Sequence, residues 1–279
     1  MAFALALVLA AAVPDPVFAP EPAPRAARGT ESAGAPSHAA EELASRKSVY
    51  ALSPLLDGAI IAAGTLGSAI PYALSSTLIK PRCPCDPAEV NSFDRHVIGN
   101  ANSFLDSTSD ATAGVVIFAP VVLDAIDLGF GQTLLEDAAL FSEVLAVNGA
   151  FVTLAKYTVQ RPLPRTYAGD PDLVGKPGGY RSFYSGHTSI AFAALSTTAY
   201  TLDARYHLGP WPWLGTAIIG TSVAAERIAA GRHFYTDVIL GAAAGTLFGT
   251  LLPWLHERHG RAEFAIAPIE NGAKVAVRF

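Results

Sequence analysis

Long apolar stretches recur from residue 58 onward and are separated by polar connections. There are six of them, and they cover residues 58–79, 113–123, 138–159, 188–202, 211–225 and 238–255. The first contains no charged residue and is long enough for an α-helix to cross a bilayer. The pattern predicts an all-α fold, a six-helix membrane bundle. The second, fourth and fifth stretches are short for a span, so a soluble helical bundle is the alternative.

Small residues are concentrated in the fifth and sixth stretches. Residues 241–245 read Gly-Ala-Ala-Ala-Gly, without a bulky side chain. In a bilayer, such positions let two helix backbones approach closely. The sequence therefore predicts tight packing of the last helices of the bundle.

The two ends of the chain depart from this helical pattern. Residues 1–19 are a possible signal peptide, but a charged start is missing and Pro20 is unfavourable after a cleavage site, so we favour an uncleaved start. Residues 20–50 are rich in Ala, Pro, Glu, Arg and Ser, which predicts a disordered linker. We expect the helical domain over residues 51–258 and a tail over 259–279, where alternating residues around Asn271-Gly272 indicate a short β-hairpin.

Composition supports a membrane location and argues against one class of partner. Of the 279 residues, 51% are hydrophobic and 15% are charged, whereas soluble domains carry about 25% charged residues. The net charge of −5 gives no indication of a nucleic-acid partner. Cys83 and Cys85 lie in a polar loop with no second ligand pair nearby, so we interpret them as a loop feature, either reduced or joined in a disulfide.

The expected topology brings two polar connections together. With six spans, the connections after the first, third and fifth helices lie on the same side of the membrane. The connection after the third helix holds a basic cluster, and the connection after the fifth holds His233. The basic cluster consists of Lys156, Arg161, Arg165, Lys176 and Arg181.

Several residues in these connections have the chemistry of a phosphate site. Ser185 is a suitable N-cap for the fourth helix, whose free amides and dipole favour an anion, and His187 stands at the edge of that pocket. His233 and Asp237 are four residues apart, a spacing that places both on one helix face. There the carboxylate can accept one imidazole proton and leave the other nitrogen free to attack. Alone, each of these features also has an ordinary structural explanation, such as a helix-start hydrogen bond.

Taken together, three ordered blocks resemble the type 2 phosphatidic acid phosphatase family, which also includes vanadium haloperoxidases. The family pattern reads Lys-x6-Arg-Pro, then Pro-Ser-Gly-His, then Ser-Arg-x5-His-x3-Asp. The second block matches at Ser185-Gly186-His187, and the third at Arg227, His233 and Asp237. The resemblance covers about residues 55–256 and implies the six-helix layout.

Three positions depart from the family pattern. Tyr184 replaces the proline of the second block, and Glu226 replaces the serine of the third. In the first block, Leu163 stands seven residues after Lys156, where the family has arginine. Arg161 and Arg165 are alternative sources of the missing guanidinium, and we favour Arg161 because it keeps the Arg-Pro order.

The resemblance also implies roles for these residues. His233 would be the nucleophile, Asp237 would orient it, and His187 would be the general acid and then the base. The phosphoryl oxygens would be bound by Lys156, Arg161 or Arg165, Ser185, Gly186 and Arg227. No metal and no cofactor is implied. Asp94, Asp106 and Asp110 are expected to be solvated loop residues without a chemical role.

The sequence therefore predicts a metal-independent membrane phosphatase that hydrolyses a phosphomonoester or diphosphate of a lipid through a phosphohistidine. Two alternatives are a vanadate-dependent haloperoxidase and a catalytically inactive lipid-binding module, the latter favoured only by Leu163. Basic residues before the first helix indicate a cytoplasmic N-terminus, which places the site on the periplasmic face of a bacterial inner membrane. A cleaved signal peptide would reverse that orientation.

Overall fold

The computed structural model describes residues 48–83, 85–258, 263–269 and 272–278. The chain divides into two units, residues 1–37 and residues 38–279, and all described residues belong to the second unit. The expected signal peptide and almost all of the expected linker therefore lie outside the described residues.

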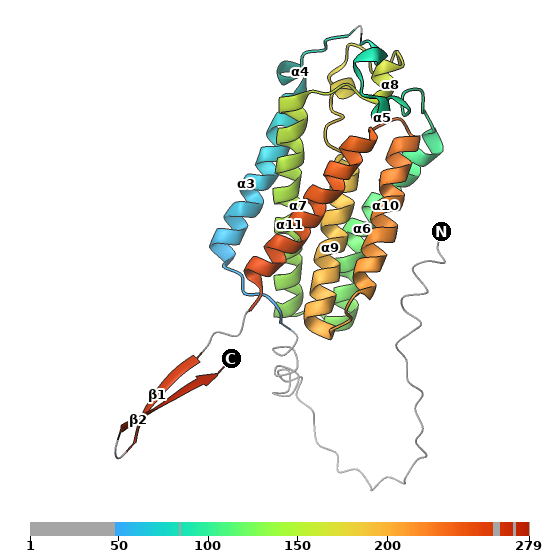
Figure 1. The fold of residues 1–279 in the computed structure, drawn as a ribbon. Coiled ribbons are helices and arrows are strands. Elements are labelled where there is room, and N and C mark those ends of the chain that lie inside the picture. Colours follow the sequence, from blue (N-terminus) through green and yellow to red (C-terminus); the bar gives the residue numbers. More distant parts are fainter. Residues whose placement is uncertain (1–47, 84, 259–262, 270–271, 279) are drawn as a thin grey trace, which may run out of the picture. The chain divides into compact units, whose positions relative to one another are not determined.

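Six long helices form the part of the chain that matches the apolar stretches (Figure 1). They confirm the predicted all-α bundle. Their bounds are α3 (Pro54–Ala73), α6 (Ser103–Leu128), α7 (Gln132–Val159), α9 (Gly186–Tyr206), α10 (Trp211–Ala229) and α11 (Tyr235–His256).

Four helical segments of the described chain are long and apolar enough to cross a membrane. They are Pro54–Ala73, Ser103–Leu128, Gln132–Tyr167 and Tyr235–His256. Helices α9 and α10 do not meet that criterion, so the count of six membrane spans stays a prediction. Both nevertheless pack inside the bundle, where α9 contacts α6, α7, α10 and α11.

The first helix differs from its predicted bounds at both ends. It begins at Pro54, before the apolar stretch, because proline is favoured in the first helical turn. It ends at Ala73 rather than continuing to residue 79. Pro71 lies in its last turn and has no amide hydrogen, and the backbone leaves the helical region at Leu74. A separate short helix, α4 (Ser75–Leu78), follows.

The second helix begins ten residues before the apolar stretch that predicted it. The Asn102 side chain caps it by accepting a hydrogen bond from the Leu105 amide at 3.0 Å. The first two turns carry Asp106, Ser109 and Asp110, which bind arginines of the C-terminal half of the chain. The polar start of α6 is therefore part of the helix because it has charged partners inside the bundle.

Helices α9 and α11 are packed backbone against backbone. A Cβ atom added to Gly245 would lie 2.2 Å from the Ser189 carbonyl oxygen, and one added to Gly249 would lie 2.5 Å from the Ala193 oxygen. Gly241 is similarly close to the Ser185 oxygen, at 2.8 Å. These glycines recur every four residues and form one face of α11, in agreement with the predicted close approach.

Short elements surround the ends of the helices where the polar connections meet. They are η1 (Pro87–Glu89), α5 (Ser92–Arg95), α8 (Pro164–Tyr167) and η2 (Pro177–Tyr180). Val90, Val97 and Phe234 form a small buried cluster that attaches the α4–α6 connection to the start of α11. Cys83 and Cys85 in this connection are joined in a disulfide.

The C-terminal tail contains an antiparallel pair of strands, β1 (Glu263–Ile269) and β2 (Gly272–Arg278). Glu263 pairs with Arg278 at the open end, and Ile269 pairs with Gly272 next to the turn. The turn itself, residues 270–271 with the expected Asn271, lies outside the described residues.

Candidate functional site

A pocket of about 590 Å³ lies between the start of α9 and the polar connections that follow α7 and α10. Most of the predicted site residues reach it. Those in its lining are Lys156, Gly186, His187, Arg227 and His233. The topology that the sequence predicted does bring the two connections together at one end of the bundle.

His233 lies in the loop before α11 and is held by the backbone of the preceding connection. Its Nδ1 is 2.7 Å from the Ser182 carbonyl oxygen. A carbonyl can only accept, so Nδ1 carries the hydrogen and Nε2 carries the lone pair. The side chain is only 5% exposed. The ring is therefore fixed in the tautomer whose Nε2 is nucleophilic.

Asp237 does not accept this imidazole hydrogen, contrary to the sequence prediction. Its Oδ2 is 3.9 Å from His233 Nδ1, beyond hydrogen-bond distance. It accepts instead from the Ser182 hydroxyl at 2.5 Å and from the Phe234 amide at 3.0 Å. Because the Ser182 carbonyl also accepts from the imidazole, Asp237 and His233 are connected through Ser182 rather than directly. The difference arises because α11 begins only at Tyr235, after His233.

Arg161 is bound to carboxylates and does not line the pocket. Its Nη1 donates to Asp237 Oδ1 at 2.7 Å, and its Nη2 donates to Asp94 Oδ2 at 2.8 Å. Its guanidinium also lies over the Phe234 ring, 4.1 Å from the centroid. The preferred candidate for the missing phosphate-binding arginine is therefore a structural link between α7 and α11.

Asp94 is a buried partner in this network rather than a solvated loop residue. It accepts hydrogen bonds from Arg161, Asn91 and Thr236, the last through both hydroxyl and amide. Burial disfavours its charge, but the hydrogen bonds from Arg161 and its other partners lower the pKa of Asp94 overall. Sequence reasoning missed this role because only the fold brings residue 94 next to residue 161.

Arg165, the alternative candidate, also lies outside the pocket lining. Its Nη2 is 2.5 Å from Asp170 Oδ2 within the same connection. Leu163, at the position where the family has arginine, is buried and does line the pocket.

Two other arginines line the pocket and were not predicted as phosphate ligands. Arg181 precedes the Ser185-Gly186-His187 block, and its guanidinium lies over the Tyr72 ring, 4.5 Å from the centroid. Its Nη1 is buried without a hydrogen-bond partner among the described residues. Arg232 precedes His233 directly. The basic cluster in the sequence already contained Arg181, but no motif spacing distinguished Arg181 from the other basic residues of that cluster as a phosphate ligand.

Lys156 and the first residues of α9 line the pocket together. Lys156 Nζ donates to the Arg181 carbonyl oxygen at 2.6 Å, so one lysine holds the backbone of the adjacent connection. Gly186 lies against this residue, since an added Cβ would be 3.6 Å from Lys156 Cε and 3.3 Å from Val152 Cγ1. Ser185 is fully buried and caps α9 through Thr188, as predicted, and it is absent from the pocket lining.

His187, Arg227 and Arg232 are paired with the two acidic residues at the start of α6. His187 Nε2 is 2.8 Å from Asp110 Oδ1, and Arg227 Nη1 donates to Asp106 at 3.0 Å. Arg232 also binds Asp106. The expectation that Asp106 and Asp110 are loop residues is therefore wrong, because both lie in the first turns of α6. Asp106 is bound to two arginines there, whereas Asp110 lines the pocket and stays solvated, with its side chain 63% exposed.

The surroundings of His233 favour its neutral form. Burial lowers the pKa of His233 well below 6.5, and the nearby positive charges of Lys156 and Arg227 lower it further. A neutral imidazole with a free Nε2 next to cations has the chemistry that nucleophilic attack on an anionic group requires.

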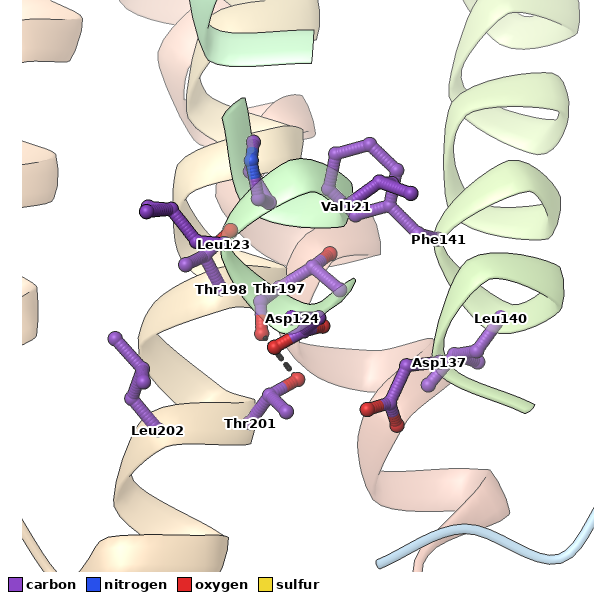
Figure 2. Close-up of a pocket in the computed structure, with 11 residues that line it drawn as sticks. Val121, Leu123, Asp124, Asp137, Leu140, Phe141, Thr197, Thr198, Thr201 and Leu202 are labelled. Carbon is purple, nitrogen blue, oxygen red and sulfur yellow. Dashed lines mark hydrogen bonds between the residues drawn. The ribbon is translucent and has the colours of Figure 1, made fainter. Parts of the chain in front are cut away.

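A second, smaller cavity of about 70 Å³ lies between α6, α7 and α9 (Figure 2). It contains Asp124 and Asp137, which pair with Arg205 at 3.7 Å and 2.5 Å. In its wall the Thr201 hydroxyl donates to the Thr197 carbonyl oxygen at 2.9 Å. None of the predicted site residues lines this cavity, so we do not assign the chemistry to it.

Comparison with known proteins agrees with the motifs. Residues 137–261 match the model of the PAP2 superfamily. Over 128 residues, or 46% of its length, this chain is 29% identical to lipid A 1-phosphatase of Porphyromonas gingivalis. That match spans only 25% of the length of the relative.

Two solved structures are also similar. One is Aquifex aeolicus LpxE, with a TM-score of 0.41 and 25% identity, covering 57% of this chain and 90% of the other. The second is a transmembrane PAP2 type phosphatidylglycerolphosphate phosphatase from Bacillus subtilis. Its TM-score is 0.47 and its identity 18%, with 74% of this chain and 98% of the other covered. The match of residues 137–261 to the PAP2 superfamily model contains all three motif blocks and confirms their resemblance to that family.

Proposed function

We propose that this chain is a membrane phosphatase that removes phosphate from a lipid phosphomonoester or diphosphate through a phosphohistidine at His233. One observation carries the proposal: a buried His233 with its Nε2 free lies in a pocket lined by basic residues. The basic residues of that lining are Lys156, Arg181, Arg227, Arg232 and the two histidines.

In the first step, the lone pair of His233 Nε2 attacks phosphorus and a P–N bond forms. The bond between phosphorus and the lipid oxygen breaks, and its electron pair leaves with that oxygen. His187 gives the leaving oxygen a proton. The charge on the phosphoryl oxygens is offset by the cations of the pocket and by the amides at the start of α9.

In the second step, water attacks phosphorus and the P–N bond breaks. The electron pair returns to Nε2, and the now neutral His187 takes a proton from the water. Inorganic phosphate leaves, and both histidines return to their starting states. The hydrogen bond from Nδ1 to the Ser182 carbonyl persists in both steps and stabilises positive charge on the ring.

A lipid substrate fits the apolar side of the same pocket. Ala113 and Ile117 of α6 and Ile190 of α9 line it next to the charged residues. Helices α3 and α6, which contribute Tyr72, Ala113 and Ile117, are both long and apolar enough to cross a membrane. An acyl or prenyl chain can therefore stay among the helices while the phosphate enters the basic end. The name of the Porphyromonas relative supports a lipid phosphate as the substrate class.

We also propose that the site faces the periplasm. The Cys83–Cys85 disulfide lies in the connection at the catalytic end, where the Cys83 amide donates to the Tyr180 hydroxyl at 3.3 Å. Disulfides persist in oxidising compartments such as the periplasm.

The direct test is phosphate release by the purified protein in detergent. A panel of phosphatidic acid, phosphatidylglycerophosphate, lipid A and undecaprenyl diphosphate is assayed at 25 °C with and without EDTA. We expect release from at least one lipid in both conditions and no release by His233→Ala. Full activity of His233→Ala would refute the mechanism. Halide oxidation in the presence of vanadate, without phosphate release, would favour the haloperoxidase alternative.

A further inference from the structure

A second cluster of titratable side chains lies at the other end of the bundle. Asp57 stands in the first turn of α3, Glu143 in α7, and His256 at the last position of α11. One ligand atom from each of the three lies within 4.8 Å of the other two. Asp237 and His256 are at opposite ends of α11, about 28 Å apart at 1.5 Å per residue. The cluster is therefore separate from the phosphate pocket.

Glu143 is the feature that needs an explanation. Its side chain is 1% exposed, and neither carboxylate oxygen has a hydrogen-bond partner among the described residues. The basic side chain next to it is that of His256, whose Nε2 is 3.6 Å from Glu143 Oε2. A buried carboxylate without partners is costly unless a positive charge is bound next to it.

The imidazole of His256 is oriented like a metal ligand. Its Nδ1 is 2.8 Å from the Leu252 carbonyl oxygen, which can only accept a hydrogen. Nε2 therefore points at the two carboxylates, 3.5 Å from Asp57 Oδ1 and 3.6 Å from Glu143 Oε2. A backbone carbonyl on the second ring nitrogen is the usual support of a metal-bound histidine.

The two separations from His256 Nε2 also suit a shared metal better than direct hydrogen bonds. An N–H···O hydrogen bond spans about 2.7–3.2 Å, shorter than either separation from His256 Nε2. Ligands at about 2.0–2.2 Å from a tetrahedral zinc ion are about 3.3–3.6 Å from each other. Asp57 Oδ2 meanwhile accepts from the Ser53 amide at 2.5 Å, which fixes that carboxylate with Oδ1 toward the cluster.

We propose that Asp57, Glu143 and His256 bind a divalent transition metal of the zinc class, with water as the remaining ligand. The ion joins the start of α3, the interior of α7 and the end of α11. Its role is to stabilise the bundle at the end opposite the phosphate pocket. The donor set of one imidazole and two carboxylates is one that zinc accepts. Sequence reasoning missed the site because its three residues are spread over three helices.

The test is cobalt binding by the tag-free full chain, purified in detergent and stripped of metal. Co²⁺ bound to such a site absorbs in the visible range, and added Zn²⁺ removes the absorption. We expect one equivalent of Co²⁺ in the wild type. Affinity should fall at least tenfold in Glu143→Gln and His256→Gln. Glu136→Gln, which removes a carboxylate at the same end of α7, should bind as the wild type does.

Thermal unfolding tests the metal site independently of the Co²⁺ titration, because it measures stability instead of absorption. Zn²⁺ should raise the Tm of the wild type and of Glu136→Gln, but not that of Glu143→Gln. The metal-free protein should keep its phosphatase turnover at 25 °C, so failure of this inference is distinguishable from failure of the phosphatase proposal. Absence of Co²⁺ binding by the wild type, or unchanged affinity in both cluster variants, would overturn the metal site.

Discussion

At the scale of single residues, the proposed mechanism depends on the protonation states of His233 and His187. The proposed nucleophile His233 must be neutral, so activity should be lost as the pH falls through the pKa of His233. Burial and the nearby cations keep that pKa well below 6.5. We therefore predict that the acidic limb of kcat/KM, corrected for the ionisation of the substrate, lies below pH 6.5. The basic limb is set by deprotonation of His187, because the proposed general acid must carry a proton.

A pH profile of kcat/KM between about pH 4 and 9 checks this prediction, because kcat/KM reports the groups of the free enzyme. An acidic limb centred at or above pH 6.5 would contradict it. The same profile measured with Lys156→Gln should have its acidic limb at higher pH, since one of the charges that lowers the pKa of His233 is then missing.

The position of the missing family arginine leads to a second prediction. Arg181 lines the pocket and has a buried Nη1 without a partner among the described residues, whereas Arg165 is bound to Asp170 outside it. We predict that Arg181→Gln lowers kcat/KM by about 10–100-fold, because a phosphoryl oxygen loses a charge-assisted hydrogen bond.

The matched control is Lys176→Gln, which removes an exposed cation from the same connection and should change kcat/KM less than about threefold. Arg165→Gln should be closer to that control than to Arg181→Gln. A large loss in Arg165→Gln together with a small loss in Arg181→Gln would instead favour Arg165, the alternative to Arg161 in the sequence analysis.

The residues of the site differ in how far the sequence could predict them. Lys156, Gly186, His187, Arg227 and His233 follow from motif spacing, and all of them line the pocket. The partners could not be predicted in the same way. Asp94, Asp106 and Asp110 come from distant parts of the chain, and only the packing of α6 and its preceding loop brings them to Arg161, Arg227 and His187.

At the scale of elements, the contact between α9 and α11 positions the pocket residues at the starts of these two helices. α9 begins with Gly186 and His187, and α11 follows His233. Since Gly245 leaves no room for a Cβ against the Ser189 oxygen, Gly245→Ala must push the two helices apart. We predict that it lowers the Tm by about 2–10 °C, the range expected from about 1–3 kcal/mol of overpacking.

Gly215→Ala in α10 is the matched control, because a Cβ at that position meets nothing within 4 Å. Alanine is a better helix former than glycine by about 1 kcal/mol, so this control should be unchanged or more stable. Equal Tm values for the two variants in detergent would show that the glycine face of α11 does not set the helix spacing.

Helix bounds illustrate what apolar patterns reveal and what they leave out. All six stretches became helices, but α6 begins ten residues earlier, where Asp106, Ser109 and Asp110 have partners inside the fold, and α3 ends at Ala73 after Pro71. An apolar pattern reports contact with lipid or core. It does not report helical turns whose polar side chains are bound to charged residues elsewhere in the chain.

At the scale of the whole molecule, the proposed orientation places the phosphate pocket in the periplasm. We predict that K176C in a C83S/C85S background reacts with a membrane-impermeant maleimide in intact cells, because residue 176 lies in the connection at the catalytic end. L208C lies between α9 and α10 at the opposite end and should react only after lysis. The reverse labelling pattern would place the site in the cytoplasm.

The central claim is that His233 carries the phosphoryl group during turnover, and rapid quench tests it most directly. The enzyme is mixed with a lipid whose phosphate is labelled with ³²P and quenched in alkali, in which phosphohistidine survives. Our account predicts that label appears on the peptide containing His233 within one turnover and disappears as inorganic phosphate is released. Phosphate release at the wild-type rate with no label on that peptide would contradict it.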